Sequence, residues 1–184
     1  MNRPKYIDIH SHLNDQAFDT DRDQCIERLR EVDVWTITIG TDYNMSQKAS
    51  ELTNTDMRLF ASVGTHPTDT VESFNEEQYR SLVHTYPKIV AIGECGLDYY
   101  RVAHERLQHE RVRQTQLFEK QIDLAVSLDL PLMIHCRDAH LDVIDILRTK
   151  KKEYEERLRG NIHFFADTVE TAKSYFDLDF TISF

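Results

Sequence analysis

The sequence predicts an α/β fold, a TIM-type (β/α)8 barrel that is incomplete and has about seven of its eight strands. Short apolar runs rich in β-branched residues alternate along the chain with segments that have helical spacing. Five of these runs end at or near a histidine or a glutamate. Barrels of this type build their active sites at the C-terminal ends of the strands. We therefore expect one domain over residues 1–184 that lacks its C-terminal strand and helices.

The composition suits a single globular domain of 184 residues, 40% of them hydrophobic. No apolar run approaches the roughly 18 residues of a membrane span, so we expect no membrane association. Three cysteines without a CxxC pair argue against cysteine-held zinc and disulfides and suit a reducing cytosol, so we expect a cytoplasmic protein. The net charge of -10 argues against broad binding of duplex nucleic acid, although bound divalent cations can reverse the sign inside a cleft.

The first strand is predicted over residues 6–13, YIDIHSHL. Strand alternation places Asp8, His10 and His12 on one face and the isoleucines on the other, so the two histidines can converge on one ion. A polar strand edge with two ordinary histidines is the alternative.

Residues 25–32 have helical spacing behind an acidic start, which favours a helix N-terminus. A second strand follows over residues 34–40 and a short helix over 45–52. The third strand, 59–63, is followed by Gly-Thr-His-Pro. Because proline cannot continue a strand ladder, we expect His66 where the chain turns into a loop.

Apolar residues between positions 74 and 83 predict the next helix. The fourth strand begins at Ile89, and we expect Gly93 to stop it, so that Glu94 lies at its C-terminal end. Residues 104–128 contain no helix breaker and are compatible with a long amphipathic helix.

A fifth strand is predicted over residues 132–136, followed by a helical pattern from position 141. The basic run 148–152 that ends this helix precedes three glutamates, so a solvated helix end is favoured over a phosphate patch. A sixth strand over 161–165 carries His163, and a helix over 168–175 leads to a seventh strand over 180–184.

Histidine is the most informative residue type in this chain. Five of the nine histidines lie at or near predicted strand ends: His10, His12, His66, His135 and His163. The other four lie on helices or their approaches, where we expect surface residues: His84, His104, His109 and His140. One core histidine needs no functional explanation, but five in equivalent positions indicate a metal site.

Glu94 is the predicted centre of this site. We expect it to bridge two ions, with His10 and His12 on one side and His135 and His163 on the other. Imidazole and carboxylate ligands suit Zn²⁺, Mn²⁺ or Fe²⁺, and Mg²⁺ where carboxylate and water dominate. Two such ions favour in-line attack on a phosphoryl group, which indicates phosphodiester hydrolysis.

Four further residues near these strand ends have two interpretations each. Arg137 either binds phosphate oxygens with its fork of donors or pairs with an acid near the rim such as Asp138. His66 either donates to a phosphate or leaving oxygen or caps its loop. Tyr99, like the tyrosine after it, either stacks on a base or anchors a loop. Asp98 is either a partner for a ligand histidine or a turn residue.

Five motifs occur in one order across nearly the whole chain: DIHSHL at 8–13, VGTHP at 63–67, IGECGLDYY at 92–100, LPLMIHCRDA at 130–139 and IHFF at 162–165. Together they resemble the TatD family of metal-dependent deoxyribonucleases, among the amidohydrolase-like TIM barrels. GECGLDY followed by a helix and IHCRDA is a specific signal, whereas HxH alone is shared by many amidohydrolases.

The resemblance implies a 3'-5' exonuclease that acts on single-stranded DNA or on 3' ends, with two divalent metal ions (Mg, Zn or Mn) and a metal-bound water as the nucleophile. It implies metal ligands at His10, His12, Glu94, His135 and His163. It also implies catalytic roles for Glu94 and His66, and substrate-binding roles for His66, Arg137 and Tyr99.

The sequence departs from the family after its seventh strand. Family members continue to an eighth strand with a metal-binding aspartate in an ETD-type motif, and this sequence ends at Phe184. We therefore expect a fragment, a truncated chain or a degenerate copy with reduced or no activity. The open edges of the first and seventh strands would favour self-association.

Two other functions remain open at this point. One is a non-catalytic remnant that binds metal or a partner. The other is an amide or lactone hydrolase of the same barrel class. A carbamylated lysine commonly bridges the metals in those hydrolases, and no lysine lies between Ile89 and Arg101.

Overall fold

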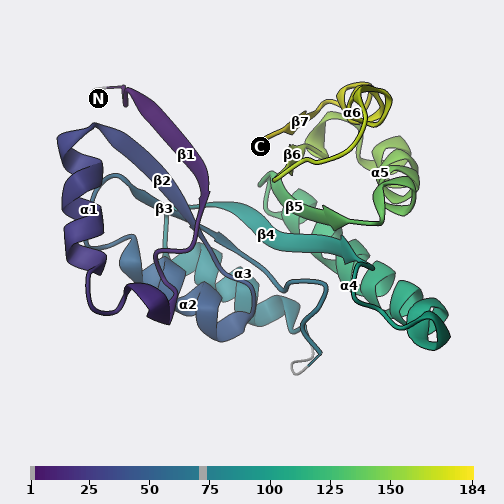
Figure 1. Cartoon of the computed structure of the whole chain (residues 1–184), viewed down its shortest axis with the longest axis horizontal. Helices are drawn as coiled ribbons and strands as arrows, with labels where there is room; N and C mark the ends of the chain where they lie inside the picture. The colour runs from purple at the N-terminus through teal and green to yellow at the C-terminus, as the bar shows by residue number, and fades with distance from the viewer. Residues whose placement is uncertain (1–2, 71–73) are drawn as a thin grey trace.

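The computed structural model describes residues 3–70 and 74–184, and within them one parallel sheet runs in the order β1 to β7 (Figure 1). The sheet curls into part of a barrel, with helices along its outer side. Its strands are β1 (Tyr6–Ser11), β2 (Val34–Ile39), β3 (Leu59–Val63), β4 (Ile89–Asp98), β5 (Leu132–Arg137), β6 (Gly160–Ile162) and β7 (Phe180–Ile182).

Helices connect consecutive strands, so the predicted alternation of strands and helices is confirmed. They are α1 (Arg22–Glu31), α2 (Tyr43–Leu52), α3 (Glu76–Thr85), α4 (Leu107–Ser127), α5 (His140–Tyr154) and α6 (Val169–Phe176). Polar side chains fix several helix starts: Asp42 accepts a hydrogen bond from the Met45 amide and Thr168 from the Thr171 amide. Three short 3-10 turns accompany them in the part of the chain that the structure describes: η1 (Gln16–Phe18), η2 (His104–Arg106) and η3 (Glu155–Arg157).

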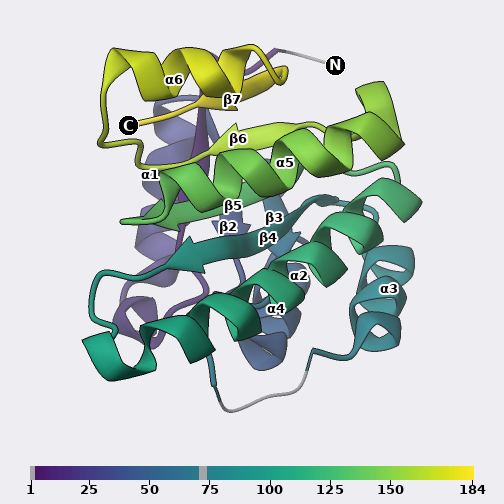
Figure 2. The same ribbon diagram turned by 90° about the vertical axis from the view of Figure 1, so that its right-hand side faces the viewer.

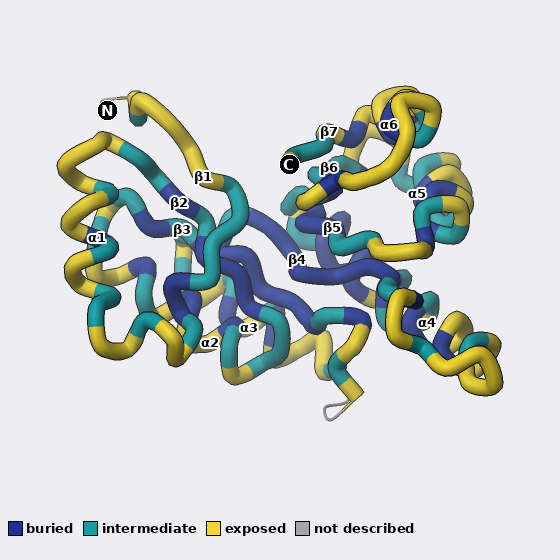
Figure 3. The backbone as a smooth tube through the Cα atoms, in the orientation of Figure 1, coloured by how far each residue is buried: buried dark blue, intermediate teal, exposed yellow. Residues whose placement is uncertain are grey.

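The main hydrophobic core lies between the helices and the outer face of the sheet. Figure 2 shows α4 and α5 crossing this face, and Figure 3 shows β4 buried at the centre of the molecule. Alternation along β5 sends Leu132 and Ile134 into this core. Met133, between them, packs in a smaller cluster with Ile39 and Ala91. The two faces of the curled sheet are therefore both apolar, as expected for barrel strands.

The predicted end of the fourth strand at Gly93 is wrong, because β4 continues to Asp98. Gly93 and Gly96 have φ values of 145° and 134°, which side chains other than hydrogen rarely allow. The register with β5 shifts between Ile92 and Cys95. The glycines therefore form a local irregularity at which the strand changes direction but does not end. Glu94 consequently lies inside the strand.

A second irregularity alters the first strand. The register between β1 and β2 shifts between Asp8 and Ser11, which breaks the strict alternation assumed for this strand. Ile7 is 59% exposed, while Ile9 packs against the inner cluster. β1 and β7 form the two edges of the sheet. Self-association through these edges stays a prediction.

Among the described residues, no helix combines the length and the apolar character needed to cross a bilayer.

Candidate metal centre

The C-terminal ends of five strands bring five predicted site residues together: four predicted metal ligands and His66. His10 lies near the end of β1, His66 follows β3, and His163 follows β6. Glu94 projects from the irregular part of β4, and His135 lies on β5. Because all strands are parallel, their carboxyl ends lie at the same edge of the sheet, which is where a barrel places its functional groups.

The buried carboxylate of Glu94 is the hub of the cluster. Its Oε1 lies 2.7 Å from His163 Nε2, 2.9 Å from His135 Nδ1 and 3.5 Å from His66 Nε2. Its Oε2 lies 3.5 Å from His10 Nε2. Burial alone would raise the pKa of Glu94, but hydrogen bonds from these imidazoles hold the pKa well below its usual range. Glu94 is therefore an anion at neutral pH.

The ligand-type atoms of the described residues form two groups, each within 4.8 Å: one of His10, Glu94 and His163, the other of His66, Asp98 and His135. The predicted division was different, because it paired His163 with His135. The rings of His10 and His163 stack with centroids 3.8 Å apart. The curl of the sheet therefore brings the ends of β1 and β6 together.

Asp98 completes the second group, and its contacts fit both of its predicted roles. Its Oδ2 lies 2.9 Å from His135 Nε2, and its Oδ1 accepts the Tyr100 amide at 3.0 Å. The spacing of four residues between Glu94 and Asp98 places both on one face of a strand. The sequence did not indicate that Glu94 and Asp98 share a strand face, because the strand was expected to end at Gly93.

His12 lies beside the two groups and joins neither of them. Its ring contacts that of His10 edge-on, with centroids 5.0 Å apart. Burial lowers the pKa of His12, and the nearby His10 lowers it further. His12 therefore stays a predicted ligand that is close to the first group.

The residues present fit divalent cations. His10 Nδ1 is a buried nitrogen without a hydrogen-bond partner in the described part of the chain. His135 has a carboxylate at each of its ring nitrogens. Burial would lower the pKa of His135, but hydrogen bonds and charge attraction from Glu94 and Asp98 raise it, so this site favours a positively charged group. Imidazoles and carboxylates are the donor set that Zn²⁺ and Mn²⁺ accept.

His66 is held in an orientation suited to donating a proton. The Thr68 amide donates to its Nδ1 at 3.3 Å, and the Thr68 hydroxyl lies 2.7 Å from the same atom. Because Nδ1 accepts, the neutral ring carries its proton on Nε2, which faces Glu94. This tautomer favours the predicted role of His66 as a hydrogen-bond donor, and its loop contact also fits the capping alternative.

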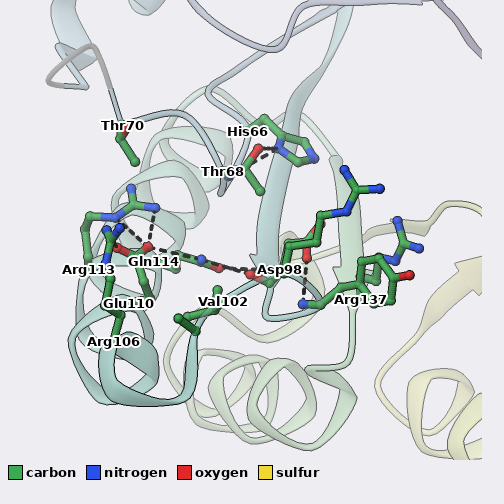
Figure 4. Close-up of a pocket in the computed structure, with 13 residues that line it drawn as sticks. His66, Thr68, Thr70, Asp98, Val102, Arg106, Glu110, Arg113, Gln114 and Arg137 are labelled. Carbon is green, nitrogen blue, oxygen red and sulfur yellow. Dashed lines mark hydrogen bonds and ion pairs between the residues drawn. The ribbon is translucent and has the colours of Figure 1, made fainter.

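A cavity of about 550 Å³ adjoins the second group of ligand atoms (Figure 4). His66 and Asp98 line it, together with four arginines: Arg101, Arg106, Arg113 and Arg137. Arg113 and Arg106 both pair with Glu110, at 2.8 and 3.1 Å. The predicted alternative for Arg137, a salt bridge to Asp138 or another acid near the rim, does not form within residues 3–70 and 74–184. Its guanidinium lies 3.7 Å from the ring centroid of Tyr100 instead.

Two predictions around this centre need correction. Tyr99 is buried, its hydroxyl donates to Asp142 at 2.9 Å and Arg111 lies over its ring, so its contacts fit the loop-anchor interpretation and not an open stacking face. Tyr100, which is 50% exposed, is the ring available there. His140, expected on the surface, is partly buried with Nδ1 2.8 Å from the Tyr175 hydroxyl. It begins α5, whose packing against α6 was not visible in the sequence.

The sequence model of the TatD-related DNase family matches residues 7–184. YabD of Bacillus subtilis, an uncharacterised metal-dependent hydrolase, is 34% identical over 180 residues, which are 97% of this chain and 68% of that protein. The 3'-5' ssDNA/RNA exonuclease TatD of Escherichia fergusonii is 34% identical over 168 residues, which are 89% of this chain and 61% of that protein.

Among solved structures, the TatD homologue YjjV of Escherichia coli K12 matches with a TM-score of 0.81 at 27% identity, covering 96% of this chain and 66% of that one. The chain thus spans between 61% and 68% of the length of these relatives. The family match covers nearly the whole chain, and the structural match covers the strands that carry the ligand cluster. On this sequence and structural evidence, the chain belongs to the TatD-related DNase family.

Proposed function

We propose that this chain is a metal-dependent phosphodiester hydrolase that removes nucleotides from the 3' end of single-stranded DNA. The observation that carries this proposal is the position of two groups of imidazole and carboxylate ligands beside an arginine-lined cavity. The 3'-5' direction and the single-stranded substrate are supported by the relatives with TatD exonuclease names.

Two divalent cations would be held by the ligand groups. His10, Glu94 and His163 would hold one, with His12 beside them, and His135 with Asp98 would hold the other. When bound, such cations supply Lewis acidity that polarises a phosphoryl oxygen and acidifies water. The anionic Glu94 adjoins both groups, so it balances the charge of both.

The chain's own residues bind and orient the substrate. Arg137 and Arg101 form no ion pair with a carboxylate in the described part of the chain, so their donors are available to phosphate oxygens at the cavity rim. This basic rim is a local exception to the net charge of -10. His66 carries its proton on Nε2, from which it donates to a phosphate or to the leaving oxygen.

The substitution Glu94→Gln tests the proposal because it keeps the side-chain volume and removes the charge. A 3'-labelled single-stranded oligonucleotide is incubated with the 184-residue chain in Mg²⁺, Mn²⁺ or Zn²⁺, and nucleotide release is measured. We expect the wild type to release nucleotides and Glu94→Gln to be slower by about 10²–10³-fold, since loss of one electrostatic group at a reaction centre costs about that much.

The matched control is Glu77→Gln, an exposed glutamate on α3 whose substitution should leave the rate unchanged. Amide and lactone substrates assayed in parallel should not be hydrolysed. Undiminished release by Glu94→Gln, or no release by the wild type with any of the three metals, would contradict the proposal.

A further inference from the structure

A second cavity of about 600 Å³ lies on the other side of the ligand cluster and differs in character from the arginine-lined one. His135 and His163 line it, whereas His66 and Asp98 line the first. Tyr100 and Arg137 line both cavities. The stacked Tyr100–Arg137 pair is therefore the wall between them. His135 of the second ligand group lies on the same side of this wall as His163 of the first.

The chemistry of this second cavity disfavours a phosphate and favours a neutral, flat ligand. Its rim carries Leu141, 80% exposed, and Phe164, 76% exposed. Three carboxylates also line it: Asp138, Asp142 and Asp167. Arg111 is occupied by an ion pair with Asp142 at 3.4 Å. These carboxylates make the cavity less favourable to a phosphate than the one lined by four arginines, while exposed apolar surface of this kind is a stacking platform for a nucleobase.

The backbone holds Phe164 in this exposed position. Its φ is 48°, in the left-handed region that non-glycine residues rarely adopt. Hydrogen bonds on both sides enforce this conformation: the His163 amide donates to Ile134 at 3.0 Å and the Phe165 amide to Ser183 at 2.8 Å. An aromatic ring fixed in solvent immediately after a ligand-type histidine is suited to stacking.

Polar atoms in the same cavity can recognise the edge of a base. Burial raises the pKa of Tyr175, so its hydroxyl is protonated and can donate to His140 Nδ1, 2.8 Å away. The proton of the neutral His140 ring then lies on Nε2, which is 3.7 Å from Asp167 Oδ2. A donor and an acceptor thus lie side by side, and every nucleobase has an edge with a neighbouring acceptor and donor.

We propose that this second cavity is the binding site for the terminal nucleobase of the substrate strand, with Phe164 as its stacking platform and His140 and Asp167 at the base edge. The Tyr100–Arg137 wall then separates this base from the phosphates, which occupy the arginine-lined cavity. The inference rests on the proposed nuclease function and adds the location and chemistry of the base site.

Binding and hydrolysis of one set of oligonucleotides test this inference. The probes are single-stranded oligothymidylates with phosphorothioate linkages that carry 2-aminopurine either as the 3'-terminal base or at an internal position. Stacking quenches 2-aminopurine fluorescence, so binding to the wild type should quench the terminal probe more than the internal one. Phe164→Ala should abolish this difference, and Phe176→Ala, which removes an exposed ring on α6, should keep it.

Hydrolysis of unmodified oligonucleotides supplies the second readout. A strand with an abasic 3'-terminal nucleotide should be cleaved about tenfold more slowly than the natural strand by the wild type, and Phe164→Ala should remove this preference by slowing only the natural strand. Equal quenching of both probes, or a base preference that survives Phe164→Ala, overturns the inference. Base-dependent quenching without hydrolysis of any strand would overturn the proposed function and leave the base site in place. Hydrolysis without base dependence would overturn the base site and leave the proposed function in place.

Discussion

Arg113 on α4 is expected to stabilise the loop that carries His66. Its guanidinium donates to the backbone oxygens of Pro67, at 2.5 Å, and Asp69, at 3.0 Å. It also pairs with the buried Glu110 at 2.8 Å (Figure 4). Arg113→Met removes these bonds and keeps the apolar stem. Each bond to a charged group is worth about 1.5–3 kcal/mol, and breaking a buried ion pair costs about 3–5 kcal/mol.

The expected loss is smaller than the sum of these terms, because Arg106 still contacts Glu110 at 3.1 Å. We expect the free energy of unfolding to fall by about 2–4 kcal/mol, which lowers the urea midpoint by about 1–2 M. Because the loop positions His66, kcat/KM for single-stranded DNA should also fall at least about tenfold.

The matched control is the same substitution two residues earlier. Arg111 has a solvent-exposed ion pair with Asp142 at 3.4 Å, and such pairs contribute about 0–1 kcal/mol. Arg111→Met should therefore shift the urea midpoint much less than Arg113→Met. A loss below about 0.5 kcal/mol for Arg113→Met, or equal losses for both variants, would refute the argument that this buried network holds the loop.

Three further predictions concern single side chains of the site. Arg137→Lys keeps the charge but loses the planar fork on Tyr100, so KM for single-stranded DNA should rise about tenfold with kcat nearly constant in steady-state assays; an unchanged KM would exclude phosphate binding by Arg137. In metal-free protein, the pKa of His135 is raised above 6.5, so its stabilising contribution is complete below pH 6.5 and is lost as the pH rises through the folded-state pKa. The difference in unfolding free energy between wild type and His135→Gln, from urea titrations in EDTA, should therefore shrink as the pH rises through the folded-state pKa of His135. A difference that grows with pH would show that the pKa of His135 is lowered on folding and not raised. Tyr99→Phe removes the hydrogen bond to Asp142 and should cost about 1 kcal/mol of stability with little change in hydrolysis, whereas a large loss of activity would restore Tyr99 as a substrate contact.

The strands and helices could be predicted from the sequence because their signals are local. The third strand has the predicted bounds, Leu59–Val63, and the other six strands were placed within a few residues of their observed positions. His66 follows β3 as predicted from the proline after it. The largest error lies at Gly93, because glycine ends some strands and allows an irregularity in others. Only pairing with β5 decides between these outcomes.

The sequence by itself determined the fold class, the family and the set of ligand-type residues, since periodicity, turn residues and motif order all lie within short segments. The tertiary structure decided how those residues are grouped. His163 lies against His10 because the sheet curls, and Asp98 joins His135 because β4 continues past its glycines. The burial of Tyr99 and the exposure of Tyr100 likewise depend on what packs against their loop. Such contacts join residues far apart in the chain, so no local pattern specifies them.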